Sequence, residues 1–251
     1  MIKKSILLIG GSGNLGSKIL NSNFFKKIYS PKKKELDLLN RNSISKTIKK
    51  KKFEIIINCA ALARIKDCEK SPSQAIKINI YGTSNLVKEI LNYNSKNKNK
   101  IKLIHISTDA VYNSIKGNYR EDSPLKPYNV YGWTKVASEF FVKLVNNHVI
   151  VRTRFFDKKT LKYKYSAKDI YTSQIEVNTL VKYLYYLVKS NFIGVINVGG
   201  KKISDYKMYK KYLPKLKPFS RKELIKKLNI TLAKDSSLNI KKFEKIKKKY
   251  E

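Results

Sequence analysis

The chain has 251 residues and a formal net charge of +37, from 55 Lys and Arg residues against 18 Asp and Glu. Hydrophobic residues make up 42% of it, enough to bury the core of one large domain, and no apolar run reaches the roughly 18 residues of a membrane-spanning helix. The two cysteines, Cys59 and Cys68, fit neither a metal-ligand spacing nor a disulfide framework, which indicates thiols in a reducing compartment. We therefore expect a cytoplasmic protein with no membrane partner.

Lysine supplies nearly all of the positive charge and occurs in every segment rather than in one patch. A protein that binds specific nucleic-acid sequences usually concentrates its charge and reads bases with arginine, which is rare here. Asn and Ile are also abundant, while Ala, Gly and Pro are scarce, so the lysine excess is typical of a genome-wide drift in composition. We expect weak, salt-sensitive adhesion to polyanions and no specific nucleic-acid partner.

Short apolar runs alternate with helical stretches along the first 153 residues. The expected strands are Ser5–Gly10, Lys27–Ser30, Glu54–Ala60, Ile101–Ser107 and Val149–Thr153, and the expected helices are Asn14–Lys27, Ser71–Tyr93 and Tyr128–Asn146. Strands that alternate with helices indicate βαβ units. The pattern therefore predicts an α/β fold, with a doubly wound parallel sheet covered by helices on both faces.

The pattern weakens after Thr153, where Asp157–Asp169 is polar and has no clear period. The elements expected beyond it are a helix at Val177–Val188, a strand at Gly194–Val198 and, from Ser204, short helical pieces broken by Pro214 and Pro218. The last stretch, IKKFEKIKKKYE, predicts a solvated, charged helix. We expect this part to cover the open end of the sheet.

Three glycines in GGSGNLG, at positions 10, 13 and 16, follow the first expected strand and open the first expected helix. Glycine at these places lets the backbone turn tightly and approach a pyrophosphate. The motif therefore predicts a Rossmann-type dinucleotide site. Together with the loss of pattern after Thr153, this site divides the chain into two expected regions. They are an NAD(P)-binding domain over residues 1–154 and a small substrate-binding region over 155–251 that does not fold independently.

The end of the second strand discriminates between the two dinucleotides, because an acid there binds the ribose 2′-hydroxyl and basic residues accept a 2′-phosphate. The segment is IYSPKKKELDL, which has no acid directly after the strand and places Lys32, Lys33 and Lys34 there. Ser30 could also bind a phosphate. The segment favours NADP(H) over NAD(H).

Tyr131 and Lys135, in NVYGWTK, stand four residues apart and so on one face of a helix. Further stretches precede them in order: Cys59-Ala60-Ala61 after the third strand, NIYGTSNL with Asn79, and ISTDAVY with Thr108. With the glycine turn, these stretches resemble the extended short-chain dehydrogenase/reductases of the dTDP-4-dehydrorhamnose reductase type. The resemblance runs from Met1 to about Thr153, with weaker echoes to the end.

The resemblance implies site residues, residue by residue. Thr108, Tyr131 and Lys135 would be catalytic, and Asp109, Arg64 and Arg154 would contact substrate. The implied cofactor-binding residues are Gly10, Gly13, Asn14, Leu15, Gly16, Ser30, Lys32, Asp37, Leu38, Cys59, Ala60, Ala61, Ala63, Asn79, Ser107 and Lys135. No metal cluster or Ser-His-acid set is visible, and we expect His105 and His148 to be packed imidazoles.

A tyrosine with a pKa of about 10 exchanges protons slowly near neutrality, and a neighbouring ammonium lowers that pKa. We expect Lys135 to lower the pKa of Tyr131 in this way and to hold the nicotinamide ribose. Tyr131 would then give a proton to a carbonyl oxygen that receives charge during hydride transfer, and Thr108 would donate a hydrogen bond to it.

Absent residues narrow the reaction within the resembled group. Nucleotide-sugar 4,6-dehydratases carry Thr-Asp-Glu where this chain has Thr108-Asp109-Ala110, and epimerase/reductases of the GDP-fucose synthase type use a cysteine that this chain lacks. We therefore expect reduction of a 4-keto-6-deoxy nucleotide sugar, in surface-polysaccharide sugar biosynthesis. A nucleotide-sugar 4-epimerase, a non-catalytic NADP-binding regulatory subunit and a homodimeric state stay open.

Overall fold

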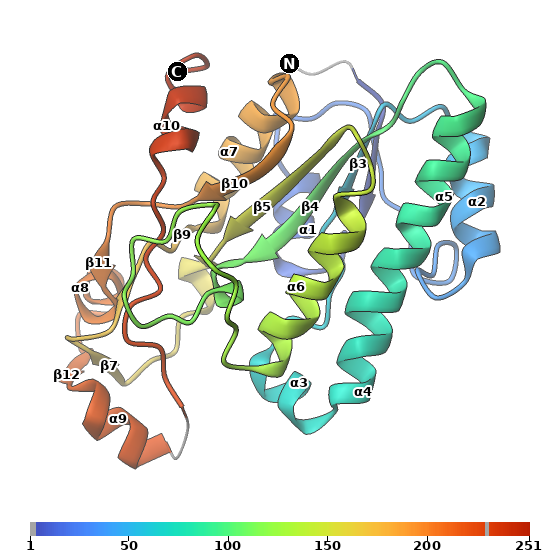
Figure 1. Ribbon diagram of the computed structural model, residues 1–251. Coiled ribbons are helices and arrows are strands. Elements are labelled where there is room, and N and C mark those ends of the chain that lie inside the picture. The colour runs from blue at the N-terminus through green and yellow to red at the C-terminus, as the bar shows by residue number, and fades with distance from the viewer. Residues whose placement is uncertain (1–3, 229–230) are drawn as a thin grey trace.

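The computed structural model describes residues 4–228 and 231–251, so the parts of the expected regions that fall on residues 1–3 and 229–230 lie outside it. Its centre is a six-stranded sheet in the order β10-β5-β4-β3-β1-β2 (Figure 1). The strands are β1 (Ile6–Ile9), β2 (Ile28–Tyr29), β3 (Ile55–Asn58), β4 (Lys102–Thr108), β5 (His148–Thr153) and β10 (Gly194–Val198). All of their pairings are parallel. The strand order reverses between β1 and β3, and ligands of open α/β sheets bind at the carboxyl ends of the strands at such a point.

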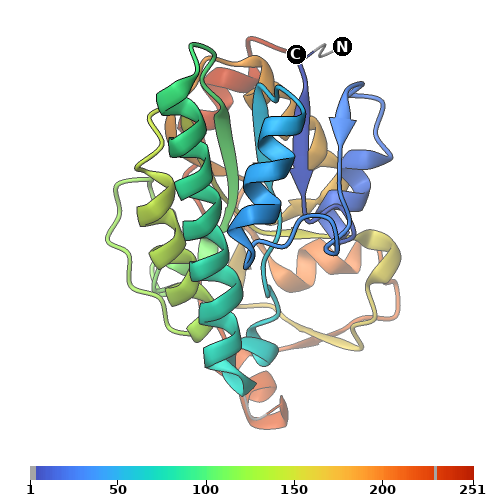
Figure 2. The same ribbon diagram turned by 90° about the vertical axis from the view of Figure 1, so that its right-hand side faces the viewer.

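Helices cover both faces of the sheet, so the predicted doubly wound α/β fold is confirmed. One layer holds α1 (Asn14–Leu20), α7 (Val177–Lys189) and α10 (Lys241–Lys247), and the other holds α2 (Arg41–Lys50), α5 (Gly82–Lys96) and α6 (Val130–Val142). Figure 2 looks onto the second layer. All four residues of β1 and of β3 are buried, as expected of strands covered on both faces. In the described ranges, no helix combines the length and apolarity needed to cross a bilayer.

The helix predicted from Ser71 is a chain of three segments that leads into the second layer. It consists of α4 (Pro72–Ala75), a π-helical segment (Ile76–Tyr81) and α5, and α3 (Ile65–Lys70) precedes it. The sequence did not predict α2 or α3. In α2 only Ile44 and Ile48 are buried among Asn, Ser and Lys, so its apolar face is too narrow for a clear period.

Two expected helices are shorter than predicted. Helix α1 ends at Leu20 rather than near Lys27, because the Ser22 hydroxyl and backbone N–H both donate to the Ile19 carbonyl (2.8 and 3.2 Å). Helix α6 begins at Val130, where Asn129 caps it by accepting a hydrogen bond from the Gly132 N–H (2.7 Å), and it ends at Val142.

The chain after Thr153 builds three two-stranded ladders and two helices beyond the end toward which β4 and β5 point (Figure 1). They are β6 (Phe155–Phe156) with β9 (Ile175–Glu176), β7 (Tyr165–Ala167) with β12 (Lys217–Phe219), β8 (Tyr171–Thr172) with β11 (Ile203–Ser204), α8 (Asp205–Lys210) and α9 (Arg221–Leu228). The expected short helical pieces form as α8 and α9 on either side of Pro214 and Pro218, but Pro218 lies inside the strand β12, which the sequence did not predict. A proline fits this strand because the ladder has only one partner strand.

Strand β10 and helix α7 lie past residue 154 but belong to the central layers. Strand β10 pairs with β5 from Gly194↔Val149 to Val198↔Thr153, and α7 packs against α1. The two expected regions therefore share one core. That residues 155–251 depend on the rest of the chain to fold stays a prediction.

The C-terminal helix α10 forms and exposes most of its charged residues, as expected, but its apolar residues pack against the core, which the sequence did not predict. Phe243 is 1% exposed, joins the core under α7, and packs its ring, tilted by 51°, with its centroid 4.8 Å from that of Tyr183. Ile246 and Tyr250 pack partly against the same core. The helix is amphipathic through a single apolar stripe, which the surrounding lysines obscure in the sequence.

Replacing Phe243 by alanine should therefore lower the free energy of unfolding by about 3 to 5 kcal/mol, the usual cost of a Phe cavity. Denaturant unfolding followed by circular dichroism measures it. The matched control is Phe140→Ala on α6, because Phe140 is 59% exposed and its loss should change stability by less than about 0.5 kcal/mol. Equal effects of the two changes would show that α10 does not stabilise the core.

Candidate active site

The glycine turn lies between β1 and α1, against the residues that follow β3. Gly10 has a φ of +85°, which favours glycine, and a Cβ on it would lie 2.7 Å from the Ala60 backbone nitrogen. A Cβ on Gly16 would lie 2.2 Å from the Gly10 carbonyl oxygen, whereas one on Gly13 would make an ordinary contact at 3.4 Å. The turn can thus form only with glycine at positions 10 and 16. Its closeness to the β3 end places it at the switch point of the sheet.

The other residues expected around a dinucleotide differ in how exposed their side chains are. Asn14, Ala63 and Lys32 are exposed, whereas the Leu15 side chain is in the core. Cys59, Ala60 and Ala61 line the end of β3 and are partly buried. Burial raises the pKa of the Cys59 thiol to about 12, although Lys135 acts to lower it.

Ser30 follows β2 and lies directly against the glycine turn. Its hydroxyl donates to the Leu8 carbonyl (3.0 Å), and its oxygen occupies the space that a Cβ on Gly11 would need. Lys32, Lys33 and Lys34 are exposed beyond it, and the Lys32 backbone N–H donates to Glu35 (2.9 Å). A basic segment therefore follows the second strand, as the sequence indicated.

Asp37 and Leu38 hold the next loop in place. The Asp37 carboxylate accepts from the Leu39 N–H (2.9 Å), and Leu38 packs in the core against Gly82. These contacts account for both side chains without a ligand. Their implied role at the cofactor stays a prediction.

Asn79 clamps the loop after β3 to the helix that carries the tyrosine. It is 1% exposed in the π-helical segment, donates to the Leu62 carbonyl (3.1 Å) and the Thr134 hydroxyl (2.9 Å), and accepts from the Leu62 N–H (2.8 Å). Its side chain thus has no spare donor, and it positions α6.

Thr108 and Tyr131 meet at the carboxyl end of β4. Thr108 is the last residue of β4 and is 6% exposed, while Tyr131 lies in the first turn of α6 and is partly exposed. The Thr108 side chain lies close enough to Tyr131 to act on the pKa of the phenol, and its hydroxyl donates to Asp109 (3.2 Å). The structure therefore brings the predicted hydroxyl pair together.

The pKa of Tyr131 is raised in this arrangement, so the expectation that Lys135 lowers it was wrong here. Burial is the largest cause and the nearby Asp109 acts in the same direction, whereas Thr108 opposes them. Lys135 is not among the groups that act on the phenol, and its Nζ lies 2.8 Å from His105 Nε2. Lys135 is 1% exposed, and burial lowers its pKa to about 8.

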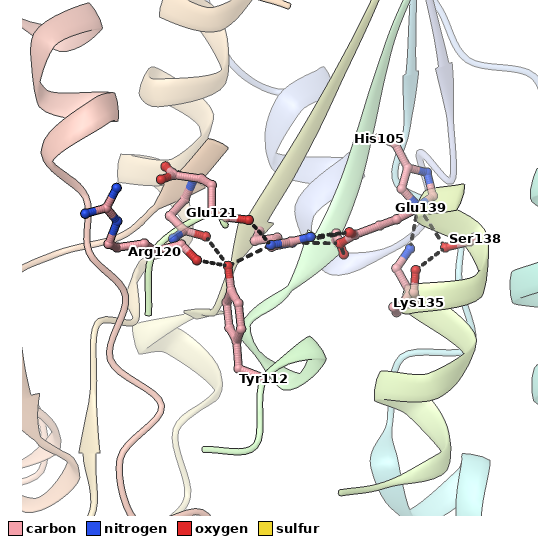
Figure 3. Close-up of polar contacts among 10 residues, drawn as sticks. His105, Tyr112, Arg120, Glu121, Lys135, Ser138 and Glu139 are labelled. Atoms are coloured by element: carbon pink, nitrogen blue, oxygen red, sulfur yellow. Dashed lines mark hydrogen bonds and ion pairs between the residues drawn. The ribbon is translucent and has the colours of Figure 1, made fainter. Parts of the chain in front are cut away.

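A buried ion pair between α6 and β5 holds this helix against the sheet (Figure 3). Glu139, two turns after Tyr131, accepts from Arg152 on β5 through both carboxylate oxygens (2.7, 3.1 and 3.2 Å) and also from the Ser107 hydroxyl. Ser107 thus bonds α6 through its side chain. Arg152 further donates to the Tyr112 hydroxyl (2.7 Å). The sequence reasoning missed Glu139, although a charge inside the strand Val149–Thr153 indicates that Arg152 needs an acidic partner.

Arg154 lies among acids and phenols from three parts of the chain. It acts on the pKa of Asp109, Asp205, Tyr128 and Tyr209, and burial raises the pKa of Asp109 against its influence. Burial lowers the pKa of Arg154 itself, but Asp109 and Asp205 outweigh it and the net pKa is raised. Asp205 and Tyr209 were missed because they lie in the variable region after Thr153.

Arg64 does not join this group. It is exposed at the start of α3, whereas the two other expected substrate residues, Asp109 and Arg154, each act on the pKa of the other. Within residues 4–228 and 231–251, no three His, Cys, Asp or Glu side chains gather in a way that could hold a metal ion.

Comparison with known proteins agrees with this geometry. The family model of the RmlD substrate binding domain matches residues 4–163. The chain belongs to this family. The predicted resemblance to the dTDP-4-dehydrorhamnose reductase type of extended short-chain dehydrogenase/reductase is thereby confirmed.

The curated relatives include both a reductase and a subunit of a different enzyme. A dTDP-4-dehydrorhamnose reductase of Aggregatibacter actinomycetemcomitans is 30% identical over 153 residues, 59% of this chain and 50% of the relative. A methionine adenosyltransferase 2 subunit beta of Xenopus tropicalis is 34% identical over 109 residues, 43% of this chain and 31% of the relative. The chain thus spans about half the length, or less, of these curated relatives.

Among solved structures, the dTDP-4-dehydrorhamnose reductase of Bacillus anthracis, determined in complex with NADP, superposes with a TM-score of 0.81. The match covers 97% of this chain and 92% of that one at 24% identity. At this identity the match supports the fold.

Replacing Gly16 by alanine should destabilise the β1–α1 turn, because its Cβ would clash with the Gly10 carbonyl at 2.2 Å. We expect a lower unfolding midpoint and loss of NADPH binding measured by fluorescence titration. Gly13→Ala is the matched control for stability, since its Cβ meets nothing closer than 3.4 Å. A Gly16→Ala protein as stable as Gly13→Ala would contradict the packing of the turn.

Proposed function

We propose that this chain is an NADPH-dependent reductase of a 4-keto-6-deoxy nucleotide sugar. The observation that carries the proposal is the approach of Thr108, at the carboxyl end of β4, to Tyr131, in the first turn of α6, with Lys135 one turn along the same helix. The family match and the name of the Aggregatibacter relative support the substrate class.

The residues fit a dinucleotide. Gly10 and Gly16 form a turn that no side chain can occupy, next to the partly buried Cys59 and Ala60. Ser30 and Lys32 follow β2 and favour a 2′-phosphate, and the NADP in the Bacillus structure supports the same choice. When bound there, the dinucleotide would supply the hydride.

The chain's own residues would donate the proton and bind the substrate oxygen that receives it. Tyr131 keeps its proton near neutral pH, and because its pKa is raised it would donate this proton efficiently only when a cation such as protonated Lys135 lies beside it. Thr108 would bind the same substrate oxygen and stabilise its growing negative charge. Asn79 and the Glu139–Arg152 pair hold α6, and with it the phenol, in place.

Arg154 and Asp109 suit a sugar better than a diphosphate. The charge of Arg154 is balanced by Asp109 and Asp205, so it offers little net attraction to a dianion. Guanidinium donors and carboxylate acceptors in one site can instead bind sugar hydroxyls and exclude wrong epimers. We assign the pair to recognition of the sugar ring.

A regulatory subunit is the second candidate, because the Xenopus relative is named as a subunit of a methionine adenosyltransferase. The two candidates differ in turnover. Steady NADPH oxidation with a 4-keto-6-deoxy nucleotide sugar supports the reductase, and tight NADPH binding without oxidation of any such substrate supports the subunit. Sugar inversion without net NADPH oxidation would indicate the 4-epimerase.

Tyr131→Phe should lower the rate of NADPH oxidation by roughly 10² to 10⁴-fold while NADPH binding is kept, because only the acid hydroxyl is removed. Stopped-flow absorbance and a fluorescence titration measure the two quantities. Tyr81→Phe, at a site that is 59% exposed, is the control and should change neither. Full activity of Tyr131→Phe would refute the proposed proton donor.

Arg154→Leu and Arg64→Leu make a second comparison. We expect Arg154→Leu to raise KM for the nucleotide sugar at least about tenfold, because Asp109 and Asp205 lose their counter-charge. We expect Arg64→Leu to have little effect on KM. Steady-state kinetics with thermal melts separate binding from folding. A larger KM effect at Arg64 would move the sugar site away from Arg154.

A further inference from the structure

His105 is a fully buried imidazole on β4 that the proposed reaction does not use. Its Nδ1 lies 3.3 Å from Asn58 Nδ2, and its Nε2 lies 2.8 Å from Lys135 Nζ and 3.2 Å from the Ser138 hydroxyl. Figure 3 shows His105 facing Lys135 and Ser138 on α6. A neutral imidazole carries one proton, so these contacts depend on which nitrogen holds it.

Asn58 determines the tautomer. Its side-chain oxygen accepts from the Ala60 backbone N–H (3.1 Å), so its amide nitrogen must face His105. An amide nitrogen can only donate, and therefore Nδ1 of His105 accepts and the proton resides on Nε2. Flipping the amide would set its nitrogen against the Ala60 N–H, donor against donor.

The Nε2 proton then points toward α6. Ser138 can receive it, since its own hydroxyl proton is donated to the Lys135 carbonyl (2.8 Å). The Lys135 Nζ at 2.8 Å is a good partner only as an uncharged amine, because an ammonium has three donors and no lone pair. A charged Lys135 in this position forces one donor–donor contact in the chain Ala60–Asn58–His105–Lys135.

We propose that Asn58 holds His105 in the Nε2–H tautomer, and that His105 thereby favours the uncharged form of Lys135 and acts as a positioning residue that controls when this lysine carries its proton. The inference rests on the proposed function only for its catalytic consequence. Lys135 would stabilise charge on Tyr131 only after it is protonated and leaves His105.

The other titratable groups facing Lys135 do not reverse this balance. Glu139 on α6 favours the ammonium but is engaged by Arg152 and Ser107, and Cys59 after β3 is a neutral thiol with a pKa of about 12. Burial, the largest cause, lowers the pKa of Lys135 to about 8. Burial and the adjacent Lys135 also hold the pKa of His105 well below its usual value, so the imidazole stays neutral.

The chain offers a direct test because it has only two histidines. Long-range ¹H–¹⁵N spectra of the cofactor-free, ¹⁵N-histidine-labelled protein distinguish the two tautomers, and His148→Gln assigns the signals. We expect His105 to be the Nε2–H tautomer across neutral pH. An Nδ1–H tautomer or an imidazolium at neutral pH would overturn the inference, whatever reaction the protein performs.

Asn58→Asp tests whether residue 58 sets the tautomer, since a carboxylate can accept from both the Ala60 N–H and an Nδ1–H of His105. We expect the tautomer to invert and the alkaline limb of kcat/KM, where Lys135 loses its proton, to move up by roughly one pH unit. His105→Met, which removes the facing N–H without adding charge, should move the limb in the same direction. Asn92→Asp on the exposed side of α5 adds the same charge and should leave the limb unchanged.

A role in packing alone would lower the rate equally at every pH, and an unmoved limb in both Asn58→Asp and His105→Met would overturn the inference. Should the wild-type protein oxidise no NADPH with any 4-keto-6-deoxy nucleotide sugar, the proposed function fails. The tautomer spectra would then decide the inference by themselves.

Discussion

The buried pair of Glu139 and Arg152 is the interaction on which the site depends most. Both residues are 1% exposed, and together with Ser107 they tie α6 to β4 and β5. Tyr131 and Lys135 lie on the same helix, so their distance from the sheet edge depends on this contact. Removing one partner of such a pair typically costs about 3 to 5 kcal/mol, because the other charge is left buried and uncompensated. Once folded, the helix can therefore adopt only one register against the strands.

The large positive charge has little part in this interior. Among the lysines that the structure describes, only Lys102 and Lys135 are buried. Lys102 donates to the Leu187 and Ser190 carbonyls around the end of α7, at 3.4 and 2.8 Å, and Lys135 bonds His105. The excess of lysine therefore remains on the surface, where it affects adhesion and solubility more than the fold. Several buried acids, in contrast, have a basic partner, as Glu139 has Arg152 and Glu89 has Arg41.

The site combines rigid and variable parts of the chain. The ends of β1, β3 and β4 and the start of α6 supply the glycine turn and the Thr108–Tyr131 pair, and regular elements hold these residues firmly. Arg154 directly follows β5, and Asp205 begins α8 among the short ladders beyond the sheet. The group around Arg154 thus combines residues from the sheet edge with a residue from the region of short ladders.

The sequence by itself determined the parallel sheet, the glycine turn and the order of Thr108, Tyr131 and Lys135, because these depend on short-range periodicity and spacing. It did not determine which of the two expected arginines acts on Asp109. It also did not determine that Phe243 is buried in the core or that the pKa of Tyr131 is raised. Those outcomes depend on burial and on partners that are distant along the chain, such as His105 for Lys135 and Glu139 for Arg152. Only tertiary packing sets the local dielectric and the hydrogen-bond partner of each group, and with them the charge that it carries.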